Sequence, residues 1–351
     1  AAAGGAWFSK DAGQNWTKVP FTQFLSLGIS DIAFSESNPD VMYMSTGDVF
    51  GSASSRDFYS IGVIKSVDGG NTWQVTSLAY ELEDNISTAK LLVDPRDANI
   101  VTVATSRGIW RTIDGGSTWD QRFNGRAFID MEYKADDPNI MIASTYGFGG
   151  NSGIYRSTDA GESWNMVISE EESNRVAIEV SPSNPNFMYA IFSRRGFNSL
   201  HSFKQSIDGG ITWQDKLSYE TNGINILGRS NGFNEDATVG QGQYDLCLAV
   251  NPDNHLDVYV GGINTWRTRN GGTSWTLETH WFGGFGAAYV HADIHDLKYS
   301  DDGQYLYSAN DGGLDRLNTN NGRWTRLDDG LNIMQYYRFN SSAQDDMFII
   351  A

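Results

Sequence analysis

Polar and apolar residues follow each other along this chain in short runs, and the same order of runs recurs from end to end. Each unit begins with two apolar runs around a polar turn, as in "VAIEVSPSNPNFMYAIFS" from Val176. A third apolar run such as "GVIKS" follows, then a polar segment such as "SVDGGNTW", then a fourth run. Short alternating runs between turn residues predict strands. Each unit is therefore expected to form two β-hairpins, with four antiparallel strands.

The tryptophan that ends each polar segment recurs at intervals of 45 to 62 residues. The seven segments, of which the last is degenerate, end at Trp16, Trp73, Trp119, Trp164, Trp213, Trp275 and Trp324. A period of roughly 40 to 50 residues is the size of a four-stranded propeller blade. A ring of such sheets buries both faces of every sheet. The predicted fold class is all-β, a β-propeller, with a linear stack of sheets as the alternative.

The two ends of the chain set the number of blades. Residue 1 and Ala351 both fall in the second strand of a unit, so the chain holds six complete units and two complementary fragments. We predict a single domain, 1–351, that forms a seven-bladed propeller with one blade shared by the two chain ends. Residues 336–351 are expected to pair with residues 1–8. Other copies continue into glycine where this chain stops, so the natural protein is expected to continue beyond Ala351.

Charge and composition exclude several kinds of partner. Acidic residues outnumber basic ones 43 to 25, which gives a formal net charge of −18. Nucleic acids and anionic membranes require a basic surface, so neither is expected as a partner. No apolar run approaches the ~18 residues that span a bilayer, so no membrane insertion is expected. The single cysteine excludes an intrachain disulfide.

The repeated polar segment has the pattern S/T-x-D-x-G-x-S/T-W, and turn chemistry explains its residue types. In "SVDGGNTW" the carboxylate of Asp68 can accept backbone hydrogen bonds within its own turn, and Gly70 supplies backbone freedom. Trp73 is expected to be a buried plug whose indole N–H meets a carbonyl. The predicted structural residues are Asp11, Asp68, Asp114, Asp159, Asp208, Asn270, Trp16, Trp73, Trp119, Trp164, Trp213 and Trp275.

This pattern is similar to the Asp-box, or BNR repeat, and the resemblance covers the whole chain. It implies that the boxes are folding devices on the outer, bottom side of the blades, and that function lies elsewhere. Sialidases need a "RIP"-like segment that is missing here, and sortilin-type receptors add a cysteine-rich module. Two-propeller xyloglucanases share the rhythm of the boxes, but their glycine-rich opening segment is not found.

The sequence most resembles large bacterial exoproteins described as sortilin-like or BNR-repeat proteins. The matching segments are "SIGVIKSVDGGNTW", "GQGQYDLCLAVNP", "YVHADIHDLKYS", "NDGGL" and "GLNIMQYYRF". The resemblance implies a secreted or cell-surface protein of a Gram-negative bacterium, exported as cargo of the type IX secretion system. Components of that system would be its partners during export. The resemblance implies no particular chemistry.

Three segments interrupt the repeat near the expected mouth of the central channel, where propellers bind ligands. They are residues 47–60, 216–243 and 280–296. The last contains "HADIHD", in which His291, Asp293 and His295 alternate and would share one face of a first strand. Three interpretations stay open, namely a polar wall that orders the channel, a metal site and a catalytic group.

Carboxylates around the mouth could hydrolyse a glycosidic bond if two of them lay ~5 to ~9.5 Å apart. The catalytic candidates are Asp48, Asp245, Asp293 and Asp311. Trp281, Phe282 and Phe285 could stack on a sugar ring or pack within their loop. The candidates for ligand binding are Asp245, Trp281, Phe285, His291, Asp293 and His295.

Two hypotheses for function follow. The main one is a secreted or cell-surface module that binds an extracellular glycan or protein without catalysis. The alternative is a carbohydrate-active glycoside hydrolase that uses carboxylates on the top face. No cofactor is expected, apart from a divalent cation considered at His291, Asp293 and His295. It would be calcium if oxygen ligands dominate, or zinc if both histidines bind it.

Overall fold

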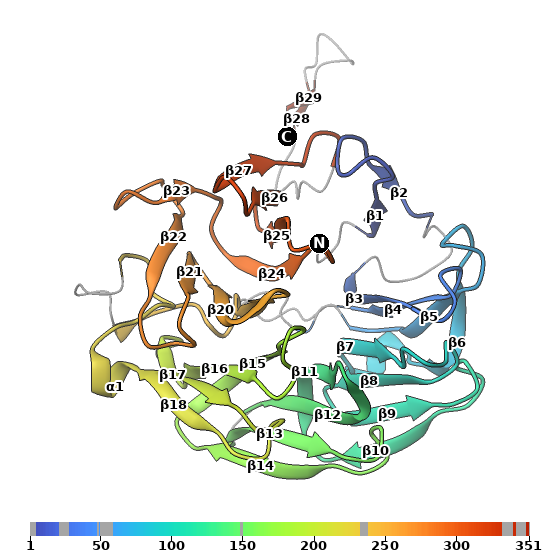
Figure 1. Cartoon of the computed structure of the whole chain (residues 1–351). Helices are drawn as coiled ribbons and strands as arrows, with labels where there is room; N and C mark the ends of the chain where they lie inside the picture. Colours follow the sequence, from blue (N-terminus) through green and yellow to red (C-terminus); the bar gives the residue numbers. More distant parts are fainter. Residues whose placement is uncertain are drawn as a thin grey trace.

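The computed structural model describes residues 5–20, 28–47, 49, 59–147, 150–231 and 238–331, with residues 340, 341, 349 and 350. Six sheets of four or five strands stand around a central axis (Figure 1). The helical elements among the described residues are α1 (Tyr219–Asn222) and a 3-10 turn (Leu82–Asp84). The predicted all-β propeller of four-stranded units is confirmed.

The first four sheets each contain four antiparallel strands in chain order, beginning at the axis and ending at the rim (Figure 1). The first is β3 (Ile29–Phe34), β4 (Met42–Thr46), β5 (Gly62–Ser66) and β6 (Gln74–Ala79). The second is β7 (Thr88–Val93), β8 (Val101–Thr105), β9 (Gly108–Thr112) and β10 (Asp120–Asn124). The third is β11 (Ala127–Lys134), β12 (Asp137–Tyr146), β13 (Ser152–Ser157) and β14 (Asn165–Glu170). The fourth is β15 (Ser173–Val180), β16 (Met188–Arg194), β17 (Leu200–Ser206) and β18 (Gln214–Ser218).

The fifth and sixth sheets carry the segments that matter for function. The fifth is β19 (Cys247–Asn251), β20 (Asn254–Gly261), β21 (Thr265–Thr268), β22 (Thr276–His280) and β23 (Ala288–Tyr289). The sixth is β24 (Ile294–Tyr299), β25 (Tyr305–Asn310), β26 (Gly313–Asn318) and β27 (Arg323–Arg326). Strand β23 pairs in parallel with β22 and forms the last strand of the fifth sheet.

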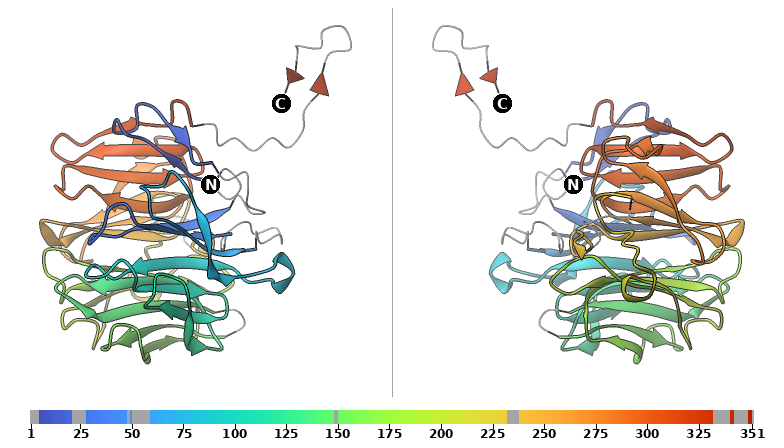
Figure 2. Two further views of the ribbon diagram at one scale, coloured as in Figure 1. Left: turned by 90° about the vertical axis from the view of Figure 1, so that its right-hand side faces the viewer. Right: turned by 90° about the vertical axis from the view of Figure 1, so that its left-hand side faces the viewer.

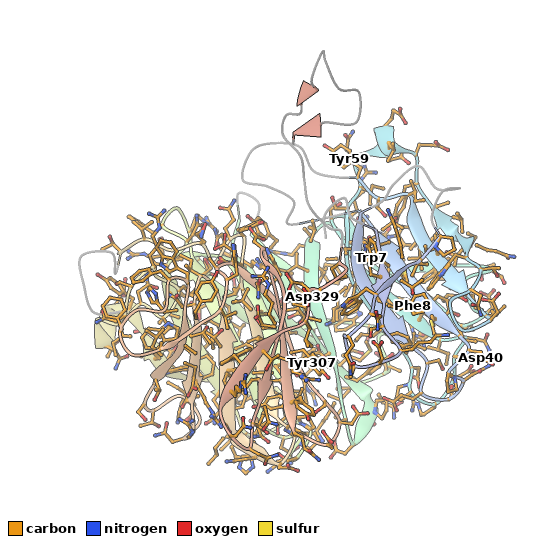
Figure 3. All side chains as sticks on the ribbon, turned by 90° about the horizontal axis from the view of Figure 1, so that it is seen from above. Trp7, Phe8, Asp40, Tyr59, Tyr307 and Asp329 are labelled. Carbon is orange, nitrogen blue, oxygen red and sulfur yellow. The ribbon has the colours of Figure 1, made fainter. Side chains whose placement is uncertain are left out.

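A short hairpin occupies the seventh place in the ring. It consists of β1 (Trp7–Phe8) and β2 (Thr17–Lys18), and it lies between the sixth and first sheets (Figure 1). The indole N–H of Trp16 donates to the carbonyl of Leu327, next to β27, at 2.8 Å. This bond joins the hairpin to the sixth sheet. In Figure 3, β1 with Trp7 and Phe8 lies on one side of the junction, and the sixth sheet lies on the other.

The predicted blade shared by both chain ends is not observed among the described strands. Strand β1 pairs with β2, while β28 (Asn340–Ser341) pairs with β29 (Ile349–Ile350). Figure 2 draws β28 and β29 apart from the six sheets. The rest of residues 332–351 lies outside the described part of the chain, as do residues 1–4.

Apolar side chains fill the spaces between neighbouring sheets. Tyr43 and Val63 of the first sheet pack against Leu91 and Val103 of the second, and all four are at most 1% exposed. Comparable clusters lie between each later pair of sheets up to the sixth. Burial of apolar area on both faces of each sheet is the main stabilising contribution to the ring.

The box turns share one hydrogen-bond pattern. In the first sheet, the hydroxyl of Ser66 donates to Asp68 (2.8 Å) and accepts from the N–H of Gly70 (2.9 Å). The carboxylate of Asp68 also accepts from the N–H and the hydroxyl of Thr72, at 2.9 and 2.6 Å. The indole N–H of Trp73 donates to the carbonyl of Gly70 at 3.0 Å. The box that ends at Trp73 therefore satisfies these polar groups within one hairpin.

The tryptophans of the boxes are not buried equally. Trp73 and Trp164 are 3% and 8% exposed, and both indoles donate to a carbonyl of their own box. Trp119 is only half-buried, and its indole nitrogen has no hydrogen-bond partner among the described residues. The expectation of a buried plug with a bonded indole N–H thus fails at this copy.

Strand register defines two ends of the ring. Ser66, where β5 ends and a box begins, faces Met42, where β4 begins. The opposite end of the same sheet has the start of β3 at Ile29, which faces Thr46 at the end of β4. We call the first the box end and the second the mouth end. No helix in the described part of the chain is long and apolar enough to cross a membrane.

Candidate functional site

Three segments meet at the mouth end of the fifth and sixth sheets. They are residues 241–246 before β19, residues 291–295 at the start of β24, and residues 310–312 between β25 and β26. The N–H of Ile294 donates to the carbonyl of Gly262 at 2.8 Å, which joins the two sheets. The N–H of Asp311 donates to the carbonyl of Asp293 at 3.3 Å, which joins the second and third segments.

Polar side chains from these segments form a continuous network. The amide nitrogen of Gln241 donates to Asp293 Oδ1 at 2.9 Å. The hydroxyl of Tyr244 lies 3.1 and 3.2 Å from the two oxygens of Asp311, and His295 Nε2 lies 2.7 Å from Asp311 Oδ1. The rings of Tyr244 and His295 meet edge to face at 4.7 Å. The network therefore fixes the carboxylate of Asp311 from two sides.

The carboxyl groups of Asp245 and Asp293 are in hydrogen-bond contact. Asp245 has no exposed surface, and neither of its oxygens accepts a hydrogen bond from any donor among the described residues. Two carboxyl groups can bond to each other only when one of them is protonated. A proton on Asp245 would let its carboxyl donate to Asp293, and that bond would satisfy the buried group.

Their surroundings move the pKa values of the three carboxyl groups in opposite directions. Burial raises the pKa of Asp245 well above its usual range, and the charge of Asp293 adds to this effect. Burial also raises the pKa of Asp293, with a contribution from the charge of Asp311. Burial alone would raise the pKa of Asp311, but His295 and the hydroxyl of Tyr244 lower it overall. These surroundings favour the protonated forms of Asp245 and Asp293 and the ionised form of Asp311.

One buried arginine positions the segment that carries these contacts. The guanidinium of Arg175, at the start of β15, donates to the carbonyls of Gln243 (3.2 Å), Tyr244 (2.7 Å) and Leu246 (3.0 Å). Burial lowers the pKa of Arg175 to about 10, so it stays charged at neutral pH, and its charge opposes the rise in the pKa of Asp245. Arg175 therefore joins the fourth sheet to the site.

The predicted residues are brought together in part. Asp245, Asp293, His295 and Asp311 lie in the network described above. Asp48 lies outside the described residues. His291 lies beside this network, and its Nδ1 is 3.2 Å from the carbonyl oxygen of Ala292.

The predicted alternation along "HADIHD" is wrong. Strand β24 begins only at Ile294, and Asp293 has a left-handed backbone with φ of 64°. His291 and Asp293 therefore precede the strand, and a two-residue period does not orient them. The described residues contain no group of three or more histidine, cysteine or acidic side chains that could hold a metal ion. His291, Asp293 and His295 thus do not assemble the metal site that was considered.

Trp281 and Phe285 do not join the carboxyl network in any contact of the described residues. They belong to a separate aromatic cluster at the end of β22, with Phe282 and His280. Their side chains are 42% and 55% exposed.

The sequence prediction missed Gln241, Tyr244 and Arg175. The segment "GQGQYDL" had been noted only as a resemblance, although Gln241 and Tyr244 lie directly before a first strand whose start faces the mouth. Position alone could have identified these two residues. Arg175 carried no comparable signal, because its role depends on contacts with residues some 70 positions later in the chain.

Comparisons with known proteins support the propeller and point to enzymes. No protein-family model matches the chain. Its sequence is 24% identical to a xyloglucanase of a Paenibacillus species over 314 residues, which cover 78% of this chain and 29% of that enzyme. The chain spans about a third of the length of the first curated relatives it matches.

Two solved structures share the fold. A GH74 enzyme of Niastella koreensis superposes with a TM-score of 0.64 and 17% identity, over 91% of this chain and 50% of that one. YCF48 bound to D1 peptide superposes with a TM-score of 0.56 and 14% identity, over 91% and 87% of the two chains. At these identities the likeness establishes the propeller fold and nothing finer.

The main functional hypothesis, a binding module without catalysis, is contradicted by these relatives, which are named as xyloglucanases. The absence of one glycine-rich segment therefore does not exclude a likeness to xyloglucanases. The regular spacing of the boxes, which the chain has in common with such enzymes, was the more informative feature for function. The comparisons favour the glycoside hydrolase that had been kept as the alternative.

Proposed function

We propose that this chain is a propeller domain of a glycoside hydrolase that acts on a xyloglucan-like polysaccharide. The proposal is supported by the names of the curated relatives, and its substrate class comes from them. The observation that carries it is that Asp293, whose pKa is raised, and Asp311, whose pKa is lowered, lie at one mouth in segments joined by the bond from the N–H of Asp311 to the carbonyl of Asp293. Carboxyl groups whose environments separate their pKa values are typical of acid and base pairs in such enzymes.

In the proposed reaction, Asp293 is the general acid and Asp311 the partner carboxylate. Asp293 donates its proton to the glycosidic oxygen while the bond from that oxygen to the anomeric carbon breaks. The carboxylate of Asp311 removes a proton from the water that attacks the anomeric carbon, or attacks that carbon itself before water does. The first route inverts the configuration at the anomeric carbon and the second retains it.

The surrounding side chains have supporting roles. Asp245 is fully buried and cannot contact a substrate in this arrangement, so it acts through Asp293 as a proton partner. Gln241 orients the carboxyl of Asp293, and His295 with Tyr244 orients that of Asp311. A fixed geometry of this kind supports proton transfer without reorganisation during the reaction.

The protein is proposed to act outside the cell, because a polysaccharide of this class is too large to enter one intact. The similarity of the boxes to Asp-box exoproteins supports export through the type IX secretion system. Loss of the protein from the medium of a strain that lacks this system, with its level inside the cell maintained, is the expected result. Unchanged secretion in that strain would exclude this route.

The test of the reaction is release of reducing ends from xyloglucan by the purified chain and by Asp293→Asn and Asp311→Asn. Each substitution should lower kcat by about 10²- to 10⁴-fold, as loss of an acid or base does. Asp302→Asn is the matched control, because Asp302 lies in the exposed turn between β24 and β25 at the box end of the same sheet. Equal activity of all four proteins would refute the site, and NMR of the first anomeric product would identify the route.

A further inference from the structure

Exposed aromatic side chains are concentrated in one short segment at the mouth end. Trp281, Phe282, Phe285 and Tyr289 are 42%, 57%, 55% and 55% exposed, within nine residues. Isolated exposed apolar residues are normal in soluble proteins, whereas a contiguous group marks a surface that binds something. We call the rings of Trp281, Phe282 and Phe285 the aromatic platform.

The aromatic platform is built from rings in mutual contact. The rings of Trp281 and Phe282 meet edge to face at 4.9 Å, and those of Phe282 and Phe285 are tilted at 6.2 Å. The imidazole of His280, which is fully buried, lies under all three at 4.1 to 6.2 Å. The exposed rings thus rest on a buried one.

Hydrogen bonds hold the platform in place. The indole N–H of Trp281 donates to the carbonyl of Arg229 at 3.2 Å, and its backbone N–H donates to Asn264 Oδ1 at 3.0 Å. His280 Nε2 donates to the same carbonyl at 3.0 Å, while its Nδ1 accepts from the N–H of Phe282 at 3.4 Å. Burial lowers the pKa of His280, which keeps the imidazole neutral, as this pattern of one donor and one acceptor requires.

The backbone of the segment is shaped to present the rings. Phe285 has a left-handed backbone with φ of 60°, a conformation that costs about 1 kcal/mol or more for a residue with a side chain. A Cβ at Gly284 would lie 2.4 Å from the ring of Phe282, so glycine at this position leaves room for the ring in its observed place. The exposure of the rings is therefore a fixed feature of this loop.

The platform and the carboxyl network share one end of the ring and one linker. Thr279, the neighbour of His280 in β22, pairs with Thr265, which in turn pairs with Gly261 opposite Cys247 at the start of β19. The chain then runs from the platform to Asp293 at the mouth. A polymer that is bound at the mouth and runs outward across the fifth sheet would reach the platform at the end of β22.

We propose that the aromatic platform is a sugar-stacking subsite that holds a polysaccharide chain away from the mouth. The apolar C–H faces of pyranose rings fit exposed aromatic faces, and a neutral glucan is compatible with a chain of net charge −18. The class of ligand rests on the proposed function. The subsite itself rests on the anchored rings and on their place at the same end of the ring as the network.

The test uses Trp281→Ala with Phe285→Ala in the background of Asp311→Asn, so that the polymer stays intact. Binding of xyloglucan polymer is measured by affinity electrophoresis and calorimetry, beside a xyloglucan oligosaccharide too short to reach the rim. The polymer should bind about tenfold more weakly to the double variant, and the oligosaccharide should bind equally well. Phe197→Ala is the matched control, since Phe197 is also exposed but packs singly against Arg194.

An unchanged affinity of the double variant for the polymer, with its melting temperature preserved, would overturn the subsite. Self-association of the parent that disappears in the double variant would also overturn it, in favour of a protein interface. Failure of the proposed function looks different. In that case the chain without any substitution releases no reducing ends, while the double variant still loses polymer binding relative to Phe197→Ala.

Discussion

The two ends of the propeller use polar residues in different ways. At the box end, the aspartate of each box bonds to groups no more than four residues away, as Asp68 does with Ser66 and Thr72. At the mouth end, the carboxylate of Asp311 bonds to Tyr244, 67 residues earlier, and Arg175 bonds to the carbonyl of Leu246, 71 residues later. Local bonds make a repeated hairpin stable by itself. Bonds between distant segments form only after the sheets have assembled. They can bring carboxyl groups close to one another without an equal number of positive charges.

Electrostatics follows the same division. The exposed box carboxylates of Asp11, Asp68 and Asp114 have pKa values lowered to about 2, because hydroxyl and backbone N–H groups of their own turns stabilise the charge. The mouth carboxyl groups of Asp245 and Asp293 have raised pKa values, because burial disfavours their charge. The carboxylates at the box end therefore stabilise the fold, whereas those at the mouth end have the shifted pKa values that are typical of functional sites.

The largest expected effect is the loss of stability when a box tryptophan is replaced, because this change should affect folding and leave the mouth end intact. Trp73→Ala should lower the free energy of unfolding by about 3–5 kcal/mol, because it removes a buried side chain and leaves a cavity. Trp119→Ala should cost less, since that ring is half-buried and its indole N–H is unpaired. Chemical denaturation gives both values. In each variant the folded protein should retain its rate of hydrolysis, and a selective loss of rate would contradict the division between the ends.

The next effect tests whether a buried arginine positions the mouth. Arg175→Met leaves three carbonyls without their donor, which should cost roughly 1–3 kcal/mol of stability and lower kcat by on the order of 10- to 100-fold. Release of the segment from 241 to 246 should also shift the acid limb of the pH–rate profile. Arg156→Met is the control, since Arg156 donates to the carbonyl of Gly209 at 2.8 Å at the box end. If both variants lose rate equally, Arg175 has no special link to the site.

The fold could be predicted from the sequence because it depends on local, repeated signals. The boxes and the apolar runs around "NPD"-type turns recur with one period, so six sheets could be placed from residue order alone. The candidate site could be predicted only in part. Asp245, Asp293, His295 and Asp311 were found from their positions at strand ends, but the orientation of His291 depended on where β24 begins, and one left-handed residue, Asp293, moved that point.

A smaller effect is the dependence of stability on pH, with opposite signs for two groups of carboxylates. The lowered pKa of Asp68 means that its contribution is present above about pH 4 and is lost as the pH falls through about 2. Burial raises the pKa of Asp31, on the first strand of the first sheet, to about 6, although Lys90 opposes the shift. The contribution of Asp31 is full below about pH 4 and is lost as the pH rises through about 6.

Denaturation midpoints between pH 2 and pH 8 measure both the loss of stability at low pH and the loss at higher pH. Asp31→Asn should flatten the fall in stability above about pH 4, while it keeps an oxygen that can accept the N–H of Leu91. Asp68→Asn should flatten the fall on the acid side. If stability still falls above about pH 4 in Asp31→Asn as it does in the parent chain, then water screens this carboxylate more fully than its burial indicates.

The smallest effect concerns the sixth box, in which Asn270 replaces the aspartate. Asn270 accepts from the N–H of Ser274 at 2.9 Å, as the aspartates of the other boxes do from the equivalent residue, but its amide nitrogen donates to the Ser274 hydroxyl. In the first sheet that bond runs the other way, from the Thr72 hydroxyl to the Asp68 carboxylate at 2.6 Å. Asn270→Asp should therefore restore a charge-assisted bond and raise the stability by about 0.5–1 kcal/mol at neutral pH. The gain should vanish near pH 2, where the carboxylate is protonated, and the rate of hydrolysis should not change. A gain that persists at pH 2 would show that the charge contributes nothing, and that the box turns depend only on having an acceptor of the right shape.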